Sequence, residues 1–425
     1  MYFKDKFTDG PNLITVPITK TRAVTILILV PVGSRYETKK INGTAHFIEH
    51  MMFKGTKNRP TNLLIAKELD ALGAEYNAFT AKDLTSYWIK LDKNYLDKGL
   101  EIISDMLFNS LFTPDEFKRE KGVILEEIKM YQDNPLLYID DLFEQTLYGD
   151  CPLGWSISGQ LKNIQELSHE VLMKFLAKHY QVKNMLVVIA GDINRMAVKK
   201  MIGKYFLGQS AESKKADFKK YVKGQPAIPR IKVLTKESQQ VQLALGFPAY
   251  SYRHPYLDTL MLLSIILGGN MSSRLFTEIR VKRGLAYSVR TDLGIYQDTG
   301  NFVVRAGVDY NKILETVQVV LDELKKIINH GVSQEELSRV KTFFAGKLSL
   351  DLEDSAEVAG WYGRQDLLIN KIYSPEQKIK LINKINGQQI QRVAKDVFKT
   401  KRLCLAIIGQ SINRFKLLSI LQAGL

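Results

Sequence analysis

The stretch Ala23-Val-Thr-Ile-Leu-Ile-Leu-Val-Pro31-Val-Gly-Ser34 decides the architecture of this chain, because a related stretch returns later in the sequence. The later stretch is Val241-Gln-Leu-Ala-Leu-Gly-Phe-Pro248-Ala-Tyr-Ser251, in which Pro248 corresponds to Pro31 at an offset of 217. Both are rich in apolar and β-branched residues, which is typical of buried strands. Their similarity indicates an internal repeat.

Three further pairs of segments support a duplication. They are Gly73-Ala-Glu-Tyr76 with Gly284-Leu-Ala-Tyr287, Thr113-Pro-Asp-Glu116 with Ser333-Gln-Glu-Glu336, and Val188-Ile-Ala-Gly191 with Ala406-Ile-Ile-Gly409, at offsets of 211, 220 and 218. Four matches in one order at nearly one offset are not expected by chance. We therefore predict two homologous domains, 1–215 and 231–425, joined by a linker over 216–230.

Each copy reads as a strand, a helix, two strands, several helices and a last strand. In the first copy, strands are predicted over 24–32, 85–91 and 185–190. Thr113 and Ser333 each stand three residues before a glutamate, the pattern of a capping box at the start of a helix. The fold class predicted for both domains is α+β, with a mainly antiparallel sheet covered by helices.

Composition and charge exclude several classes of protein. The chain has 425 residues, 45% of them hydrophobic, which suits a folded protein with a large core. The net charge of +15 comes without any arginine-rich run, so we expect no nucleic-acid partner. Cys151 and Cys404 form no CxxC pair, which leaves no disulfide framework and no cysteine zinc site. We find neither a signal-peptide core nor an apolar run of membrane-spanning length, so we expect a cytoplasmic protein without membrane insertion.

The segment Gly43-Thr-Ala-His46-Phe-Ile-Glu49-His50-Met-Met-Phe53 carries the clearest chemical pattern. If Thr44 caps a helix, the two histidines lie one turn apart, with Glu49 on the same side. Two such imidazoles can chelate zinc, and the glutamate can take a proton from a zinc-bound water. This is the His-x-x-Glu-His order of one class of metalloproteases. A chance pair of histidines on one helix is the alternative.

A third protein ligand is needed, because a catalytic zinc usually has three and one open position. The helix predicted over 114–131 offers Glu120, Glu126 and Glu127. Glu120 and Glu127 are two turns apart and share a face, whereas Glu126 lies about 100° away. The alternative for all three is a charged, solvated helix face.

The second copy serves as an internal control. At the local offset of 217, His46, Glu49 and His50 fall opposite three apolar residues, Leu263, Ile266 and Leu267. At the local offset of 220, Glu120 and Glu127 fall opposite Val340 and Lys347. The first copy thus has every proposed metal-site group and the second has none, so we expect one metal-binding and one metal-free domain.

With these residues in view, the chain resembles the M16 family of zinc peptidases, which includes pitrilysin, insulin-degrading enzyme and the mitochondrial processing peptidase. The resemblance covers the full length and is nearest to the bacterial single-chain form, similar to the processing-peptidase β subunit. The family has a fixed spacing of 77 between the second histidine and a later glutamate, which selects Glu127 here. The resemblance implies one zinc ion per chain, held by His46, His50 and Glu127. Glu120, seven residues earlier, is implied to support a ligand.

Two further groups of residues match the family by position. Arg280 and Tyr287 match an arginine and a tyrosine that reach the substrate from the metal-free domain. Arg283 is an alternative candidate for the role of the arginine. The segment Glu75–Thr80 matches the substrate-binding edge strand, which implies that Asn77, Ala78 and Phe79 contact substrate. Solvation of the arginines and packing of Phe79 are the alternatives.

The resemblance implies a zinc metalloendopeptidase with Glu49 as general base on a zinc-bound water. Its substrates would be peptides or unfolded polypeptide segments enclosed in a chamber. Family members close that chamber as a clamshell of two such halves, so we expect a homodimer or a heterodimer with a related inactive chain. The alternatives are a catalytically inactive structural or partner subunit of an M16-type complex and, on the charge alone, a nucleic-acid-binding protein.

Overall fold

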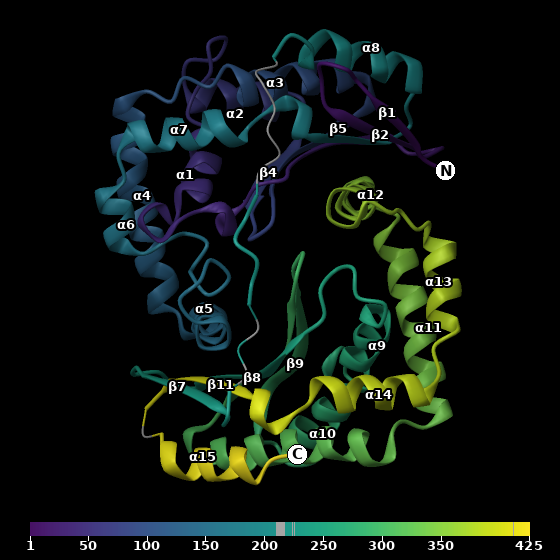
Figure 1. Cartoon of the computed structure of the whole chain (residues 1–425). Helices are drawn as coiled ribbons and strands as arrows, with labels where there is room; N and C mark the ends of the chain where they lie inside the picture. Colours follow the sequence, from purple (N-terminus) through teal and green to yellow (C-terminus); the bar gives the residue numbers. More distant parts are fainter. Residues whose placement is uncertain (210–216, 223, 225, 411) are drawn as a thin grey trace. The chain divides into compact units, whose positions relative to one another are not determined.

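A computed structural model describes residues 1–209, 217–222, 224, 226–410 and 412–425 of the chain (Figure 1). The chain forms two compact units, each assembled from three separate segments. The first unit comprises Met1–Ile128, Ser156–Lys219 and Ser349–Ser374, and the second comprises Lys129–Trp155, Lys220–Leu348 and Pro375–Leu425.

The first unit contains a six-stranded sheet in the order β1-β2-β6-β3-β5-β4. Only β2 and β6 pair in parallel, and the other neighbours are antiparallel. The strands are β1 (Phe3–Lys6), β2 (Asn12–Pro17), β3 (Ala23–Val30), β4 (Glu75–Thr80), β5 (Thr85–Asp92) and β6 (Leu186–Gly191). The strands predicted over 24–32, 85–91 and 185–190 are therefore present.

The second unit contains a five-stranded sheet in the order β7-β11-β8-β10-β9, again with one parallel pair, β7 and β11. The strands are β7 (Arg230–Thr235), β8 (Val241–Ala249), β9 (Ala286–Ile295), β10 (Gly300–Val308) and β11 (Cys404–Gly409). This order repeats β2-β6-β3-β5-β4 strand for strand. The predicted duplication and the mainly antiparallel sheets are thus confirmed.

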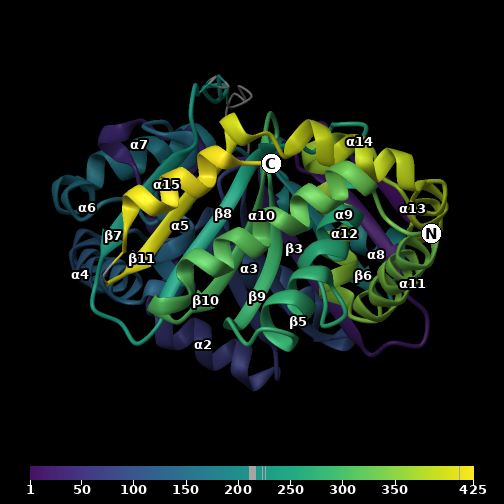
Figure 2. The same cartoon turned by 90° about the horizontal axis from the view of Figure 1, so that it is seen from below.

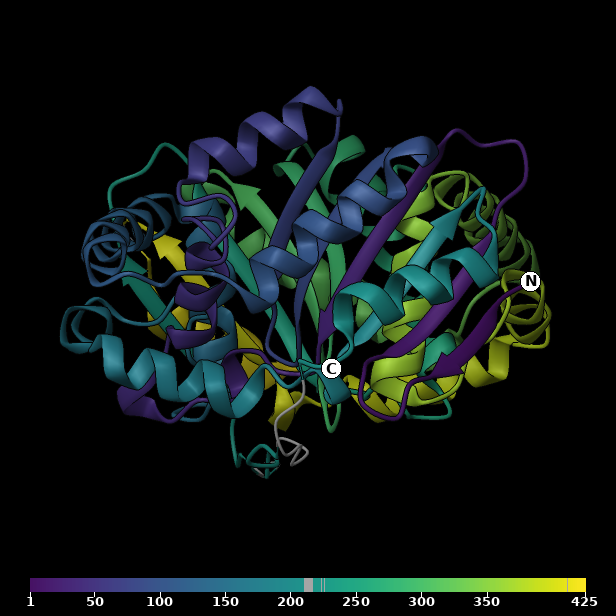
Figure 3. The same cartoon turned by 90° about the horizontal axis from the view of Figure 1, so that it is seen from above.

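Helices cover one face of the first sheet, where they bury Ile26 and Ile28 in a continuous apolar core. Figure 3 views this layer, in which α3 and α8 cross the strands. The helices are α1 (Thr44–Met51), α2 (Asn62–Ala71), α3 (Leu96–Phe108), α4 (Pro114–Asp133), α6 (Leu161–Glu166), α7 (His169–His179) and α8 (Arg195–Phe206).

The second sheet has a corresponding layer in which α9, α10 and α14 pack together, seen in Figure 2. Leu263, Ile266 and Leu267, which fall opposite the histidine motif, are buried in this core. The helices are α9 (Leu257–Gly268), α10 (Ile313–His330), α11 (Gln334–Asp351), α13 (Pro375–Asn383), α14 (Gly387–Val397) and α15 (Arg414–Ala423). Short 3₁₀ turns lie at Ser34–Tyr36, Lys39–Ile41, Lys93–Tyr95, Val182–Asn184, Tyr310–Lys312 and Thr400–Arg402, and a π-helical turn lies at Phe276–Val281.

The two halves of the sequence exchange one helix. Helix α5 (Pro135–Tyr148), from the first half, packs on the second sheet, where Phe143 joins a cluster with Ala244 and Val303. Its counterpart in the second half, helix α12 (Ser355–Ile369), packs on the first sheet against β3 and β6. The compact units therefore depart from the linear division into 1–215 and 231–425. Residues 216, 223 and 225 of the predicted linker lie outside the described residues.

The predicted capping boxes are present in part. Thr113 Oγ1 accepts a hydrogen bond from the Glu116 amide, and Ser333 Oγ accepts one from the Glu336 amide. The carboxylates bind arginines: Glu116 pairs with Arg119, and Glu336 with Arg274. Among the helices of the described ranges, none has the length and apolarity that a membrane span requires.

Candidate metal centre and active site

Helix α1 presents His46, Glu49 and His50, but Thr44 does not cap it as we predicted. Gly43 occupies the N-cap position with φ of 101°, a left-handed conformation that favours glycine. Thr44 is the first helical residue, and its hydroxyl donates to the Ile41 carbonyl. The helix is therefore where the sequence predicts it, and the predicted cap is wrong.

The cap is supplied instead by Glu37, six residues before Gly43. Its buried carboxylate accepts hydrogen bonds from the Gly43 amide (2.8 Å), the Ala45 amide (2.6 Å) and the Asn42 side chain (2.9 Å). Burial raises the pKa of Glu37 to about 7, against the opposing effect of these bonds. The sequence did not predict this role for Glu37, because the known capping patterns include only residues next to the start of a helix.

The structure brings His46, His50 and Glu127 together, with one candidate ligand atom from each lying within 4.8 Å of the others. His46 Nε2 is 3.7 Å from Glu127 Oε1, and His50 Nε2 is 3.5 Å from Glu127 Oε2. The two imidazole rings are 4.5 Å apart between centroids. Both Nε2 atoms therefore lie near one carboxylate, which α4 contributes. Glu126, the neighbour that spacing disfavoured, is exposed on α4.

Glu120 orients His50 from the preceding turns of α4. Its Oε1 lies 2.7 Å from His50 Nδ1, and its Oε2 lies 2.6 Å from the ammonium of Lys54. Because Glu120 is ionised, we assign the proton to His50 Nδ1, which leaves Nε2 free to bind a metal. Burial raises the pKa of Glu120, but the bonds to His50 and Lys54 outweigh it and lower the pKa overall. Lys54 was not among the residues predicted from sequence.

The residues fit a zinc ion. Two imidazole nitrogens and one carboxylate oxygen form a recurring donor set of catalytic zinc sites. Glu127 Oε2 is buried and makes no hydrogen bond within the described residues, as expected of an atom that needs a cation. Burial lowers the pKa of His46 to about 3, so its imidazole is neutral and able to act as a ligand.

Glu49 lies beside the end of β4. Thr80, the last residue of that strand, donates a hydrogen bond of 2.5 Å to Glu49 Oε2. Burial raises the pKa of Glu49, partly offset by this bond. A carboxylate with a raised pKa is a stronger base and is suited to accept a proton. The Thr80 contact joins strand β4 to helix α1 and was not foreseen.

Strand β4 is the edge of the first sheet, as predicted for Glu75–Thr80. It pairs with β5 on one side only. Asn77 is exposed, Ala78 is half-buried and Phe79 is 37% exposed. The strand can therefore accept an additional strand along its outer edge.

Arg280 and Tyr287 belong to the second unit, where they contact each other. The Arg280 guanidinium lies 4.8 Å from the ring centroid of Tyr287 and 5.0 Å from that of Phe276. Tyr287, near the start of β9, is 73% exposed. Arg283 is bound to the Glu278 carboxylate. This pairing distinguishes it from Arg280, which stacks on aromatic rings.

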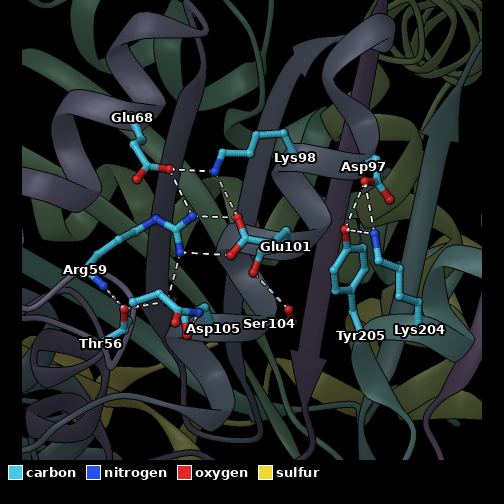
Figure 4. A network of polar contacts seen from close by, with 11 residues as sticks. Thr56, Arg59, Glu68, Asp97, Lys98, Glu101, Ser104, Asp105, Lys204 and Tyr205 are labelled. Carbon is cyan, nitrogen blue, oxygen red and sulfur yellow. Dashed lines mark hydrogen bonds and ion pairs between the residues drawn. The ribbon is translucent and has the colours of Figure 1, made fainter.

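The loop after α1 is tied to α3 by a buried arginine (Figure 4). Arg59, 3% exposed, binds Asp105 at 2.8 Å and the carboxylates of Glu101 and Glu68. The Thr56 hydroxyl also donates to Asp105. These bonds fix the loop that directly follows Lys54, the residue that binds Glu120.

Comparison with known families gives two matches that together span most of the chain. Residues 13–160 match the model described as Insulinase (Peptidase family M16), and residues 166–344 match the Peptidase M16 inactive domain. The first range contains the two histidines and Glu127, and the second contains Arg280 and Tyr287.

Whole-length relatives agree with these matches. An uncharacterized zinc protease of Bacillus subtilis is 32% identical, with 95% of this chain and 97% of that protein aligned. One of Rickettsia bellii is 34% identical, over 96% and 98%. The crystal structure of a protease from Helicobacter pylori has a TM-score of 0.91 at 26% identity and covers 96% of this chain and 99% of that one.

A further structure supports the fold alone. The M16 inactive-domain protein of Pseudomonas fluorescens has a TM-score of 0.88 at 20% identity, over 97% of this chain and 98% of that one. The strand order, the residues gathered around α1 and the whole-length relatives agree, and the chain belongs to the M16 family of peptidases, the insulinase family.

Proposed function

We propose that this chain is a zinc-dependent endopeptidase that hydrolyses peptides or unfolded polypeptide segments. The observation that carries the proposal is the grouping of His46, His50 and Glu127, with Glu49 held beside them by Thr80. A structural subunit without activity would have no need of this arrangement. The zinc-protease names of the relatives support the same conclusion.

His46, His50 and Glu127 would hold one zinc ion per chain. When bound, zinc supplies Lewis-acid chemistry: it polarises the scissile carbonyl and lowers the pKa of a bound water. Glu120 keeps the Nε2 of His50 directed at the ligand cluster.

Glu49 acts as the general base. It would take a proton from the attacking water and return it to the leaving amine, and its raised pKa strengthens it as the base in the first transfer. Tyr287 would donate a hydrogen bond to the developing oxyanion, and Arg280, stacked on the Tyr287 ring, would help to hold the substrate.

The substrate would bind as an extended strand along the edge of β4. Backbone hydrogen bonds from β4 then supply affinity for many sequences, while the neighbouring side chains select among them. Asn77, Ala78 and Phe79 lie along this edge, which ends at Thr80 and Glu49.

Replacing Glu49 with glutamine tests the proposal. We expect peptide hydrolysis to fall by about 10²–10⁴-fold, the usual contribution of a general base, while zinc content stays near that of the wild type. Glu127→Gln should lose zinc, and the adjacent Glu126→Gln should keep both zinc and activity. Metal analysis and cleavage of a mixed peptide library measure these outcomes.

Wild-type turnover by Glu49→Gln would reject the mechanism. Zinc binding by a wild-type protein that cleaves no peptide would favour an inactive M16 subunit.

We also propose that the active species pairs two chains, either identical or related. One chain carries one metal-binding copy and one metal-free copy, so a second chain would supply the other half of a closed chamber. Arg280 and Tyr287 of one chain would then serve the metal centre of the other. Glu49→Gln and Tyr287→Phe proteins, each inactive alone, should regain up to about a quarter of wild-type activity when mixed under subunit exchange. No recovery in exchanged dimers would exclude action between chains.

A further inference from the structure

Helix α12 places an arginine beside the edge strand of the first sheet. The Arg364 guanidinium lies 5.8 Å from the ring centroid of Phe79. Figure 1 shows α12 on the side of the first sheet away from α3 and α8. The packing agrees: a Cβ on Gly363 would meet Leu27 and Leu29 of β3, whereas Ile26 and Ile28 face the core under α1 and α3.

The register of the strands puts Phe79 on the α12 side. Phe79 pairs with Ser86, and Ser86 pairs with Leu29, which contacts α12. Side chains alternate along a strand, so Thr80 points to the opposite side, where its hydroxyl binds Glu49. Arg364 and Glu49 therefore lie on opposite faces of the same end of β4.

The charge of Arg364 is uncompensated. The side chain is exposed, and no carboxylate in the described ranges forms an ion pair with it. At the other end of β4 the situation is reversed, because Lys90 is shared between Asp354 (2.7 Å) and Glu75 (3.4 Å). On the α12 face, one end of β4 thus carries a positive charge that has no ion-pair partner among the described residues, and the other end carries an excess of negative charge.

A peptide added along β4 would present every second side chain to the α12 face. The side chain opposite Phe79 would meet the Arg364 guanidinium, whose planar donor groups suit a carboxylate. This position is adjacent to Thr80 and Glu49, and so to the bond that is cleaved.

We infer that Arg364 is a specificity-determining residue that selects peptides with an aspartate or glutamate within two residues of the cleaved bond. The inference rests on the proposed peptidase function and names a substrate class for it. The helix that carries Arg364 comes from the metal-free half of the sequence, so the second copy would contribute to selection in the first unit.

Pairs of peptides test the inference. The two members of a pair differ only in having glutamate or glutamine at the position opposite Phe79, within two residues of the cleaved bond. We expect the wild type to prefer the glutamate peptide about three- to fivefold in kcat/KM, the range of a partly exposed ion pair. Arg364→Gln should abolish this ratio while cleaving the glutamine peptide normally, and Arg364→Glu should favour a lysine peptide. Arg195→Gln, on α8 on the opposite face of the sheet, is the charge-matched control and should keep the wild-type ratio.

Binding separates this inference from the proposed function. Fluorescence anisotropy of the same peptides on Glu49→Gln protein, with and without Arg364→Gln, measures selection without turnover. A binding preference that depends on Arg364 would support the inference even if no form cleaves a peptide, in which case the proposed function fails alone. A glutamate preference that is unchanged by Arg364→Gln, or that is absent from the Glu49→Gln protein with Arg364 in place, would overturn the inference.

Discussion

At the scale of single residues, a chain of contacts links the candidate metal centre to Lys54, which is not one of the three candidate ligands. We call this chain of contacts the relay. Lys54 binds one oxygen of Glu120, and the other oxygen of Glu120 binds His50. Because Glu120 is only 3% exposed, the lysine also compensates a buried negative charge. Lys54 is therefore linked to the candidate metal centre through Glu120 and His50.

Removing this lysine should weaken metal binding. In Lys54→Met, Glu120 loses one of its two partners and holds the His50 ring less firmly, so we expect zinc affinity to fall by about tenfold, the lower end of the effect of such supporting residues. Competition with a chromophoric chelator measures it. Lys54→Arg should restore most of the affinity, and Lys57→Met, an exposed neighbour, should have no effect. Equal zinc affinity in Lys54→Met and the wild type would contradict the relay.

The grouping of His46, His50 and Glu127 was predictable from sequence, whereas the residues around it were not. The spacing of His46 and His50 and the contrast with the second copy pointed to helix α1, and the resemblance selected Glu127 over Glu126. Lys54, Thr80 and Glu37 have no comparable signal, because each depends on a contact that only the folded chain creates.

At the scale of elements, α1 is capped at its N-terminus by the buried carboxyl group of Glu37. Glu37 accepts two amide hydrogen bonds there, where the helix dipole also favours negative charge. Glutamine can supply only one acceptor oxygen and turns an amide group towards the other donor. Near pH 5 the raised pKa keeps Glu37 protonated in the folded protein, so its neutral carboxyl group likewise has one carbonyl acceptor and one donor group. We therefore expect Glu37→Gln to change the free energy of unfolding by less than about 1 kcal/mol near pH 5, as measured by urea unfolding of metal-free protein.

The same variant should change the pH dependence of stability. The pKa of Glu37 is raised in the folded state to about 7, so folding favours its protonated form. Its contribution to stability is complete below the unfolded pKa and declines as pH rises to about 7, by about 3 kcal/mol in total. Glutamine does not titrate, so Glu37→Gln should gain stability relative to the wild type between pH 5 and 7. Glu170→Gln, on the exposed surface of α7, is the control. A difference that is constant with pH would rule out this titration.

A glycine pair on α12 tests how closely this helix packs on the first sheet. A Cβ at Gly363 would come within 2.9 Å of Leu29 and 3.0 Å of Val188, whereas one at Gly360 would meet only the Arg364 side chain at 3.9 Å. We expect Gly363→Ala to destabilise the protein by about 1–3 kcal/mol through overpacking. Gly360→Ala should be neutral or slightly stabilising, since alanine favours helix. Thermal unfolding compares them, and equal melting temperatures would contradict the close packing.

At the scale of the whole molecule, the exchange of α5 and α12 is what the sequence could not reveal. The sequence pattern of an amphipathic helix indicates that one face of the helix covers an apolar surface. It does not indicate which of two similar sheets provides that surface. The repeat offset placed both helices in equivalent positions, and their assignment to the opposite units follows only from packing. A linear division at the linker therefore separates each sheet from one of its two helical layers.

This exchange predicts that neither half of the sequence folds independently. A fragment of residues 1–219 lacks α12 and leaves Leu27, Leu29 and Val188 uncovered, so we expect it to aggregate or to bind a hydrophobic dye such as ANS. A fragment of residues 220–425 lacks α5, which packs against Ala244 and Val303. Co-expressed, the two fragments should form a soluble one-to-one complex, because each supplies the helix that the other lacks, and the complex should bind zinc as the intact chain does. Size-exclusion chromatography with light scattering and circular dichroism measures both expectations. A soluble 1–219 fragment with a cooperative thermal transition would show instead that the first sheet is stable without α12.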